Sequence, residues 1–185
     1  MTQGTSIWTI FRQRNENLIY CAGILKFQEQ KMGNIRRAEE KDVSRIAEIL
    51  VVNYRMNFRR FFNNDEYYFG ELNVIDTIRE FREKGLFGRI FVYDDGVVKG
   101  FISINGTEVE KLFVEPFFQN GGIGAELLRF AVEEHGADFL WALEYNARGI
   151  EFYKRNGFFP TGEKMIEDEW VPLVKLSREK ARPSC

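Results

Sequence analysis

The segment that decides the fold is the glycine-rich stretch at 114–124, VEPFFQNGGIG, which is followed at once by AELL at 125–128. An apolar strand at 112–114 leads into a turn marked by Pro116, and three glycines within four positions then open an amphipathic helix. Glycine lets the backbone approach a ligand closely, and a helix N-terminus presents unpaired N–H groups with a partial positive charge. The stretch therefore predicts a binding site for a phosphate or pyrophosphate group.

Length and composition are typical of a globular protein with one buried core. The chain has 185 residues, of which 44% are hydrophobic and 29% charged, and its formal net charge is -2. A charge so close to zero gives no electrostatic reason to expect a nucleic-acid partner. We expect most of the 18 phenylalanines to lie in the core and a minority to line a pocket.

The cysteines and the hydropathy pattern indicate whether to expect a bound metal, a particular cellular compartment or a membrane-spanning helix. Cys21 and Cys185 form neither a metal-spaced pair nor a disulfide framework, so we expect no bound metal and a reducing, cytoplasmic setting. No run of about 18 apolar residues predicts a membrane-spanning helix. The N-terminal stretch lacks the apolar core and small-residue cleavage site of a signal peptide.

The organised pattern begins after Gly33. Residues 1–33 hold short apolar pieces without sustained periodicity, and they are either an N-terminal arm or an over-extended start of the reading frame. Residues 34–178 form the predicted domain, and the polar tail at 179–185 is expected to fray. The sequence contains no internal repeat and no second domain.

Helical periodicity and turn signals predict a mixture of helices and strands. A helix is expected behind an N-cap at Asp42, with Val43, Ile46, Ile49 and Leu50 at helical spacing. Further helices are expected at 74–84, from the glycine stretch to about 135, and at 146–155. Strands are expected at 35–38, 89–93, 97–104, 108–114, 138–144, 158–165 and 171–177, with an Asp-Gly hairpin at 94–96. Hairpins early and a β-loop-α-β-α unit late predict a mixed α/β domain.

A second segment, NARGIEFYKRNGF at 146–158, makes the pattern specific. With the glycine stretch, it resembles the GNAT superfamily of acyl-CoA-dependent N-acetyltransferases. Gln119, Gly122 and Gly124 fit the pyrophosphate-binding motif Gln/Arg-x-x-Gly-x-Gly/Ala of that family. The second segment fits Asn-x-x-Ala-x-x-Phe-Tyr-x-x-x-Gly-Phe, with Gly149 where alanine is usual. The resemblance covers roughly residues 35–177.

The resemblance implies the GNAT acyltransferase fold, an α/β (mixed α+β) arrangement. Its central sheet is mixed and mostly antiparallel, with one parallel pair of strands that splay apart at the CoA site, and helices flank it. Acetyl-CoA is the implied co-substrate, and a pantetheine arm would lie in the splay like an added strand. The implied cofactor-binding residues are Phe113, Val114, Gln119, Asn120, Gly121, Gly122, Ile123, Gly124, Asn146 and Tyr153.

One position departs from the family pattern. Lysine, arginine or asparagine is usual just before the second glycine of the loop, where this chain has Gly121. A basic side chain there would add charge near the pyrophosphate. Without that side chain, the pyrophosphate would be bound by backbone N–H groups and the helix dipole.

Acyl transfer from a thioester to an amine also needs proton transfers and a polarised carbonyl. The resemblance assigns Tyr153 as general acid, because a phenol with a pKa near ~10 stays protonated at neutral pH; packing is the alternative role. A backbone N–H at 112–114 would polarise the thioester oxygen. Glu108 and Glu110 share one face of a strand and are the candidates for general base, directly or through water, or else a solvated pair. His135 is interpreted as a surface residue at a helix C-terminus.

The implied activity is that of an acyltransferase, which moves an acetyl group from acetyl-CoA to a primary amine by direct transfer. Residues 54–70 hold aromatic side chains and arginines that either bind the small-molecule or peptide acceptor or form a simple lid helix. Acidic residues at 163–169 contact a cationic acceptor or form a solvated turn. The alternative function is a non-catalytic acyl-CoA sensor. Acceptor identity, acyl-chain length and a homodimer stay open.

Overall fold

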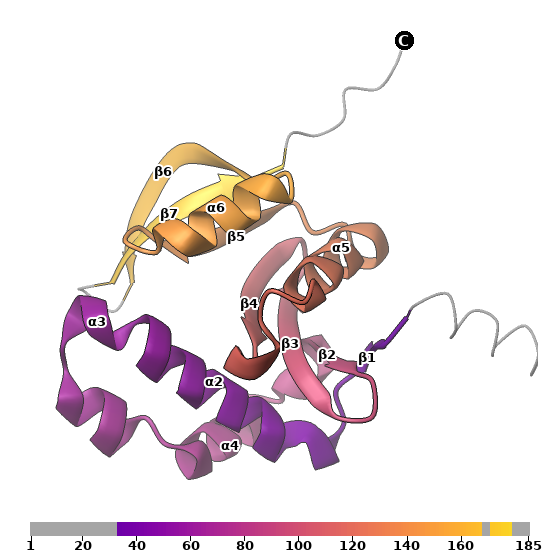
Figure 1. Cartoon of the computed structure of the whole chain (residues 1–185), viewed down its shortest axis with the longest axis vertical. Helices are drawn as coiled ribbons and strands as arrows, with labels where there is room; N and C mark the ends of the chain where they lie inside the picture. The colour runs from indigo at the N-terminus through magenta and orange to yellow at the C-terminus, as the bar shows by residue number, and fades with distance from the viewer. Residues whose placement is uncertain (1–32, 168–170, 179–185) are drawn as a thin grey trace, which may run out of the picture. The chain divides into compact units, whose positions relative to one another are not determined.

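The computed structural model describes residues 33–167 and 171–178, and a seven-stranded sheet runs through them in the order β1-β2-β3-β4-β5-β7-β6 (Figure 1). The extension predicted at 1–33 lies outside the described residues except for Gly33, and so does the tail at 179–185. The strands are β1 (Ile35–Arg37), β2 (Ile90–Asp94), β3 (Val98–Asn105), β4 (Glu108–Val114), β5 (Phe139–Leu143), β6 (Phe159–Glu167) and β7 (Val171–Ser177).

One pair of neighbouring strands is parallel, and the other pairs are antiparallel. The parallel pair is β4 and β5, which match only Glu108 with Phe139 and Val109 with Leu140. Beyond Val109, β4 continues beside β3 alone, with Val114 still opposite Gly100. This arrangement confirms the expected mixed sheet, and it leaves one edge of β4 without a neighbouring strand.

Five α-helices are described, and they cover both faces of the sheet (Figure 1). They are α2 (Val43–Asn57), α3 (Arg59–Phe62), α4 (Val74–Glu83), α5 (Ile123–His135) and α6 (Ala147–Arg155). Short helical turns lie at Glu40–Asp42, Leu86–Arg89 and Pro116–Phe118, and a π-helical turn lies at Glu66–Glu71.

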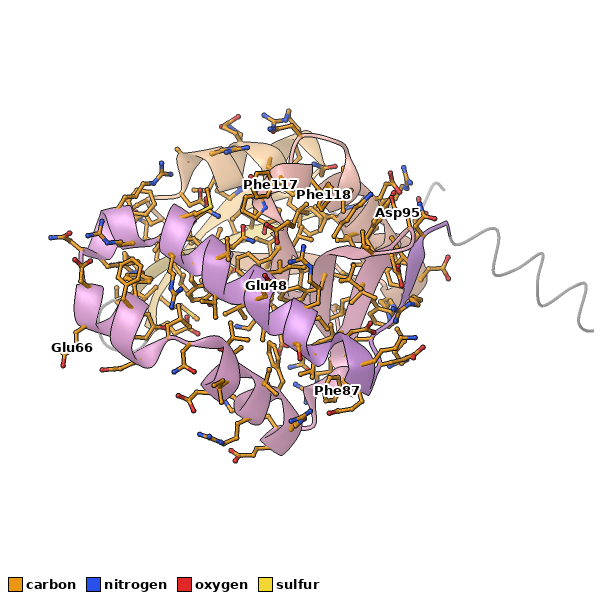
Figure 2. The ribbon with its side chains drawn as sticks, turned by 60° about the horizontal axis from the view of Figure 1, so that its bottom comes forward. Glu48, Glu66, Phe87, Asp95, Phe117 and Phe118 are labelled. Atoms are coloured by element: carbon orange, nitrogen blue, oxygen red, sulfur yellow. The ribbon has the colours of Figure 1, made fainter. Side chains whose placement is uncertain are left out.

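Two buried clusters follow from the alternation of side chains along the strands. Ile90 and Val92 of β2 face α2 and α4, which lie across one face of the sheet (Figure 2). Phe91 and Tyr93, the alternating residues of the same strand, face the cluster that contains α5. The hydrophobic face expected of the helix after the glycine stretch is therefore buried against the sheet.

The helix expected behind Asp42 is present, with two details that the sequence did not indicate. Asp42 is its N-cap, as expected, but its side chain makes no capping bond to that helix. Its carboxylate instead accepts bonds from the Arg36 guanidinium at 2.7 and 2.9 Å and from the Glu39 N–H at 2.8 Å. The helix that follows continues past Leu50 to Asn57, and Val51 and Asn53 prolong its buried face.

Candidate functional site

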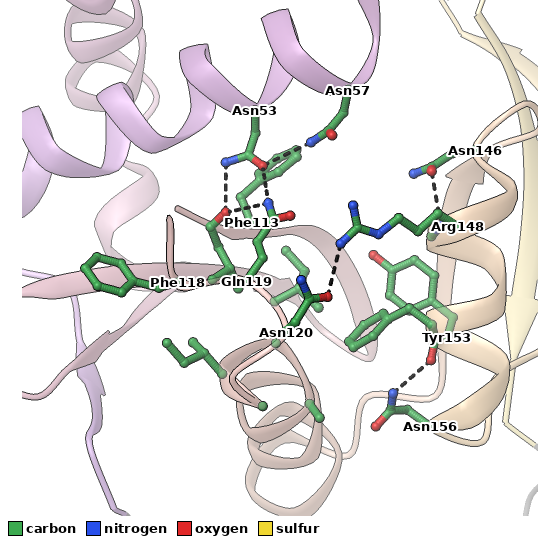
Figure 3. Close-up of a pocket in the computed structure, with 18 of the residues that line it drawn as sticks. Asn53, Asn57, Phe113, Phe118, Gln119, Asn120, Asn146, Arg148, Tyr153 and Asn156 are labelled. Atoms are coloured by element: carbon green, nitrogen blue, oxygen red, sulfur yellow. Dashed lines mark hydrogen bonds between the residues drawn. The ribbon is translucent and has the colours of Figure 1, made fainter. Parts of the chain in front are cut away.

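A cavity of about 480 Å³ lies between the end of β4, the start of α5, one side of α6 and the end of α2 (Figure 3). Both sequence motifs line it, although they are separated by more than a helix and a strand in the chain. Of the predicted cofactor-binding residues, those on the lining are Phe113, Val114, Gln119, Asn120, Gly122, Ile123, Gly124, Asn146 and Tyr153. Gly121 belongs to the same loop but is not on the lining.

The glycine loop has the backbone shape of an anion-binding turn. Asn120 and Gly122 adopt left-handed conformations with φ of 65° and 90°. Gly122 is also the N-cap of α5 and provides no side-chain cap, so the first-turn N–H groups of α5 keep no capping partner. Successive N–H groups in such a turn form a concave surface that binds anions, and the helix dipole adds to it.

Gly124 allows α5 to lie close to α6. A Cβ atom placed on Gly124 would come within 3.3 Å of Cζ of Phe152 and 3.7 Å of Cγ2 of Val114. The first turn of α5 therefore packs directly on the aromatic ring of α6 and on the end of β4. This contact fixes the distance between the two motifs.

A network of side-chain amides joins the loop to α2 (Figure 3). The buried Asn53, 1% exposed, donates to the carbonyls of Ile49 at 2.8 Å and Val114 at 3.1 Å. Gln119 donates to the same Val114 carbonyl at 3.1 Å and to Oδ1 of Asn53 at 3.2 Å, and Asn57 donates to that oxygen at 3.1 Å. The side chain of Gln119 thus anchors the loop to α2, and the Val114 carbonyl already has two donors.

Tyr153 is half-buried, and its hydroxyl points into the cavity (Figure 3). Burial raises the pKa of the phenol to about 12. The ring lies edge-on to Phe152 at a centroid distance of 5.2 Å. Both features of the sequence prediction, a packed ring and a protonated hydroxyl, are therefore present in one residue.

Asn146 is the N-cap of α6. Its Oδ1 accepts the Gly149 N–H at 3.1 Å, and a Cβ at Gly149 would lie only 2.4 Å from the Asn146 Nδ2. Glycine at 149, where alanine is usual in the family, gives the folded-back amide the space that it occupies. The side chain lines the cavity but is already engaged in capping.

Glu108 and Glu110 do not line the cavity. Glu108 lies in the paired part of β4, opposite Phe139, where burial and then the charge of Glu110 raise the pKa of its carboxyl. Glu110 lies where the register between β3 and β4 shifts, and it accepts a hydrogen bond from Ser103 at 2.8 Å. The assignment of a general base to either residue stays a prediction.

His135 is the last residue of α5, as expected, but it is half-buried. Its ring packs against Phe91 and Phe130 at centroid distances of 4.6 and 5.2 Å. Burial, followed by the charge of Arg37, lowers the pKa of the imidazole. The residue therefore acts as a packing aromatic more than as a cation at the helix end.

The aromatic and basic segment at 54–70 contributes only Asn57 and Phe58 to the cavity. Two of its arginines have internal partners: Arg55 donates to two backbone carbonyls, and Arg59 pairs with Asp65 at 2.6 Å. In the acidic segment at 163–169, Glu163 pairs with Lys175 at 3.0 Å, while Asp168 and Glu169 lie outside the described residues. An acceptor-binding role for either segment stays a prediction.

Several lining residues were not predicted from the sequence, chiefly Asn53, Arg148, Phe152 and Arg155. Asn53 had a signal, since a polar residue in the buried phase of an amphipathic helix needs internal partners. Arg148 lies inside the second motif, and its Nη2 donates to Oδ1 of Asn120 at 3.2 Å. In the part of the chain that the structure describes, no group of three or more His, Cys, Asp or Glu could hold a metal ion.

Comparison with known proteins agrees with this geometry. Residues 87–160 match the acetyltransferase (GNAT) domain family. That segment of the chain is therefore similar to GNAT acetyltransferases. The match includes β4, the glycine loop and α6, but not α2, whose end also lines the cavity.

Two curated relatives are N-acetyltransferases by name. An uncharacterised N-acetyltransferase of Methanocaldococcus jannaschii is 38% identical over 74 residues, which make up 37% of this chain and 31% of that protein. Peptidyl-lysine N-acetyltransferase YjaB of Salmonella typhimurium is 29% identical over 88 residues, or 48% of this chain and 61% of that protein. This chain thus spans less than two thirds of the length of either relative.

Solved structures share the fold. Apo YjaB from Escherichia coli matches with a TM-score of 0.64 at 21% identity, over 80% of this chain and 97% of that one. YncA from Salmonella typhimurium, solved with acetyl-CoA, matches with a TM-score of 0.57 at 23% identity, over 81% of this chain and 96% of that one.

No helix in the described ranges is long and apolar enough to cross a membrane.

Proposed function

We propose that this protein transfers the acetyl group of acetyl-CoA directly to a primary amine. One observation carries the proposal: the glycine loop and the hydroxyl of Tyr153 line the same cavity, where β4 has parted from β5. The cavity thus combines an anion-binding turn with a protonated phenol. Acyl transfer from a CoA thioester needs both, one to hold the co-substrate and one to supply a proton.

The lining fits a phosphate-bearing co-substrate. Among the described residues on the lining, the charged ones are Arg148 and Arg155, and both are cationic. The left-handed turn at Asn120 and Gly122 adds backbone N–H groups beside Arg148. When bound, acetyl-CoA supplies an acyl group that is already activated as a thioester.

The unpaired edge of β4 is assigned to the pantetheine arm. Beyond Val109 this edge has no strand beside it, so it can hydrogen-bond an extended chain as an added strand. Phe113 and Val114 lie on this edge and line the cavity. Because the Val114 carbonyl already accepts bonds from Asn53 and Gln119, the contact falls to other backbone groups of 110–114.

Tyr153 is assigned as the general acid, since its raised pKa keeps the phenol protonated throughout the neutral range. Glu108 and Glu110 are assigned as general base through water, because neither side chain lines the cavity. The amine acceptor is a small molecule or a peptide. The name of YjaB, a peptidyl-lysine N-acetyltransferase, supports including lysine peptides among the candidates.

The test is release of CoA thiol from acetyl-CoA in the presence of a panel of small amines and lysine peptides. Tyr153→Phe should lower kcat by about a hundred-fold or more, the contribution typical of a general acid. It should leave the Kd for CoA within about two-fold, since the hydroxyl is expected to act in the chemical step. Tyr93→Phe is the matched control, because its hydroxyl bonds Asn34 away from the cavity. Unchanged kcat in Tyr153→Phe would remove the assigned role.

A non-catalytic acyl-CoA sensor is the second candidate. The observation in its favour is that no carboxylate lines the cavity among the described residues. A sensor would bind acetyl-CoA without releasing thiol on any amine of the panel and without hydrolysing it slowly alone. Thiol release that depends on an amine would exclude it.

A further inference from the structure

The glycine loop of this protein has no cation of its own. The position that carries lysine, arginine or asparagine in the family pattern is Gly121, and the loop from 119 to 124 contains no basic residue. Backbone N–H groups and a helix dipole amount to about half a positive charge, whereas a pyrophosphate carries at least two negative charges. A cation from another element would complete the charge balance.

The first turn of α6 brings a cation to the loop. Arg148 lines the cavity, and its Nη2 donates to Oδ1 of Asn120 at 3.2 Å, across the opening between α5 and α6 (Figure 3). This bond uses one of the five N–H groups of the guanidinium, and the planar fork can offer a pair of the others to a phosphate. Asn120 is in the left-handed turn itself, so the bond holds the charge beside the anion-binding backbone.

We propose that Arg148 is the pyrophosphate-binding residue of this protein and replaces, from α6, the cation that Gly121 does not supply. The inference rests on the proposed use of acetyl-CoA. The guanidinium reaches from α6 to the loop, so that a co-substrate bound there would contact both α5 and α6. Asn120 acts as the positioning residue for the guanidinium.

Gly121 offers a way to test the exchange. Its φ lies outside the left-handed range, and a Cβ there would meet only the Phe118 carbonyl oxygen, at 3.5 Å. A side chain at 121 therefore fits without strain, in contrast to Gly122. Gly121→Lys can return a cation to the loop in a chain that lacks Arg148.

The experiment is calorimetric titration of the full chain with CoA and with dephospho-CoA, which keeps the pyrophosphate but lacks the 3′-phosphate. Arg148→Gln should weaken both ligands by about ten-fold or more, the loss expected for a charge-assisted hydrogen bond. It should also flatten the salt dependence of Kd, because one screened charge is gone. Lys154→Gln is the matched control: it removes the same charge from the same helix, where Lys154 pairs with Glu151. It should leave Kd unchanged.

The rescue separates charge from structure. Gly121→Lys added to Arg148→Gln should recover at least about three-fold in affinity, while thermal unfolding confirms that each variant is folded. Equal affinity of Arg148→Gln and the wild type would overturn the inference, and so would a loss seen with CoA but not with dephospho-CoA, or no recovery by Gly121→Lys. Failure of the wild type to bind CoA would instead overturn the proposed function.

Discussion

Backbone conformation distinguishes two adjacent glycines at the residue scale. Gly122 has a φ of 90°, where any other L-residue is strained, whereas Gly121 lies outside that range. Gly122→Ala should therefore cost about 1–2 kcal/mol in the loop conformation that presents the N–H groups. We expect a CoA affinity about ten-fold weaker for Gly122→Ala, measured by titration.

Gly121→Ala is the control for this prediction. The added methyl group meets only the Phe118 carbonyl at 3.5 Å, which is ordinary contact, so affinity should stay within about two-fold. Gly124→Asp should weaken CoA binding in a different way, because it adds an anion beside the loop and crowds Phe152. Equal binding by Gly122→Ala and Gly121→Ala would contradict the role of the left-handed turn.

His135 should make stability depend on pH. Burial against Phe91 and Phe130 and the charge of Arg37 lower the pKa of the folded imidazole below its ordinary value of 6.5, although Glu134 opposes this. The unfolded chain therefore binds the proton first as the pH falls. The stabilising contribution is complete above pH ~6.5 and is lost as the pH drops from there through the folded pKa.

Urea unfolding across pH 5 to 8 measures this effect. His135→Phe keeps an aromatic ring between Phe91 and Phe130 but cannot titrate, so its stability should change less between about pH 6.5 and 5 than that of the wild type. Parallel curves for the two proteins over this range would show that His135 does not carry the dependence.

At the element scale, α2 is tied to β4 by Asn53. The Asn53 Nδ2 donates to the carbonyl of Ile49 in a buried bond and to that of Val114 in a partly buried one. Asn53→Asp keeps the shape of the side chain. It replaces the amide nitrogen that donates to two carbonyls with a carboxylate oxygen, which can only accept. It should lower the free energy of unfolding by about 2 kcal/mol or more and loosen the Gln119 anchor of the loop.

Asn57→Asp, one turn later on α2, is the comparison. Asn57 is less buried and donates a single bond, to Asn53, so the same substitution should cost about 1 kcal/mol or less. Chemical denaturation gives both values, and CoA titration shows whether the loop has loosened. A smaller effect at Asn53 than at Asn57 would contradict the proposed anchor.

Elements with local signals were predicted well. The helix expected at 74–84 is observed at Val74–Glu83 and ends before Gly85, whose φ of 60° breaks the helix. The strand expected at 108–114 is β4, with the same bounds. The π-helical turn at Glu66–Glu71 had no such local signal, because side-chain donors from another helix bind its carbonyl groups. Arg55 of α2 donates to the carbonyls of Tyr68 and Leu72 at 2.8 and 2.9 Å.

The same division holds for the site. The loop residues and Tyr153 could be predicted because their motifs are continuous in sequence, and all of them except Gly121 line one cavity. The bond from Arg148 to Asn120 joins residues 28 positions apart, and the bond from Gln119 to Asn53 joins residues 66 apart. Such contacts depend on how α2 and α6 pack against the end of β4, which periodicity along the chain does not encode.

At the scale of the whole described domain, the sheet has a weak seam. The strands β1–β4 and the strands β5–β7–β6 are joined in the ladder only by the two matched pairs of β4 and β5, while α5 packs over the junction. The cavity lies at this seam, between elements of both parts. A ligand that contacts the loop, β4 and α6 together would therefore hold the two parts to each other.

Co-substrate binding should accordingly raise the melting temperature. A ligand at one hundred times its Kd adds about 2.7 kcal/mol to the free energy of unfolding, or roughly 5–10 °C for a domain of this size. Tyr153→Phe should show the full shift with CoA, since its hydroxyl is assigned to proton transfer, whereas Gly122→Ala should need a higher CoA concentration for the same shift. Because salt screens the contact with the phosphates, the shift at a fixed CoA concentration should shrink as ionic strength rises. A shift that is insensitive to salt and to Gly122→Ala would mean that CoA stabilises the domain elsewhere than at the glycine loop.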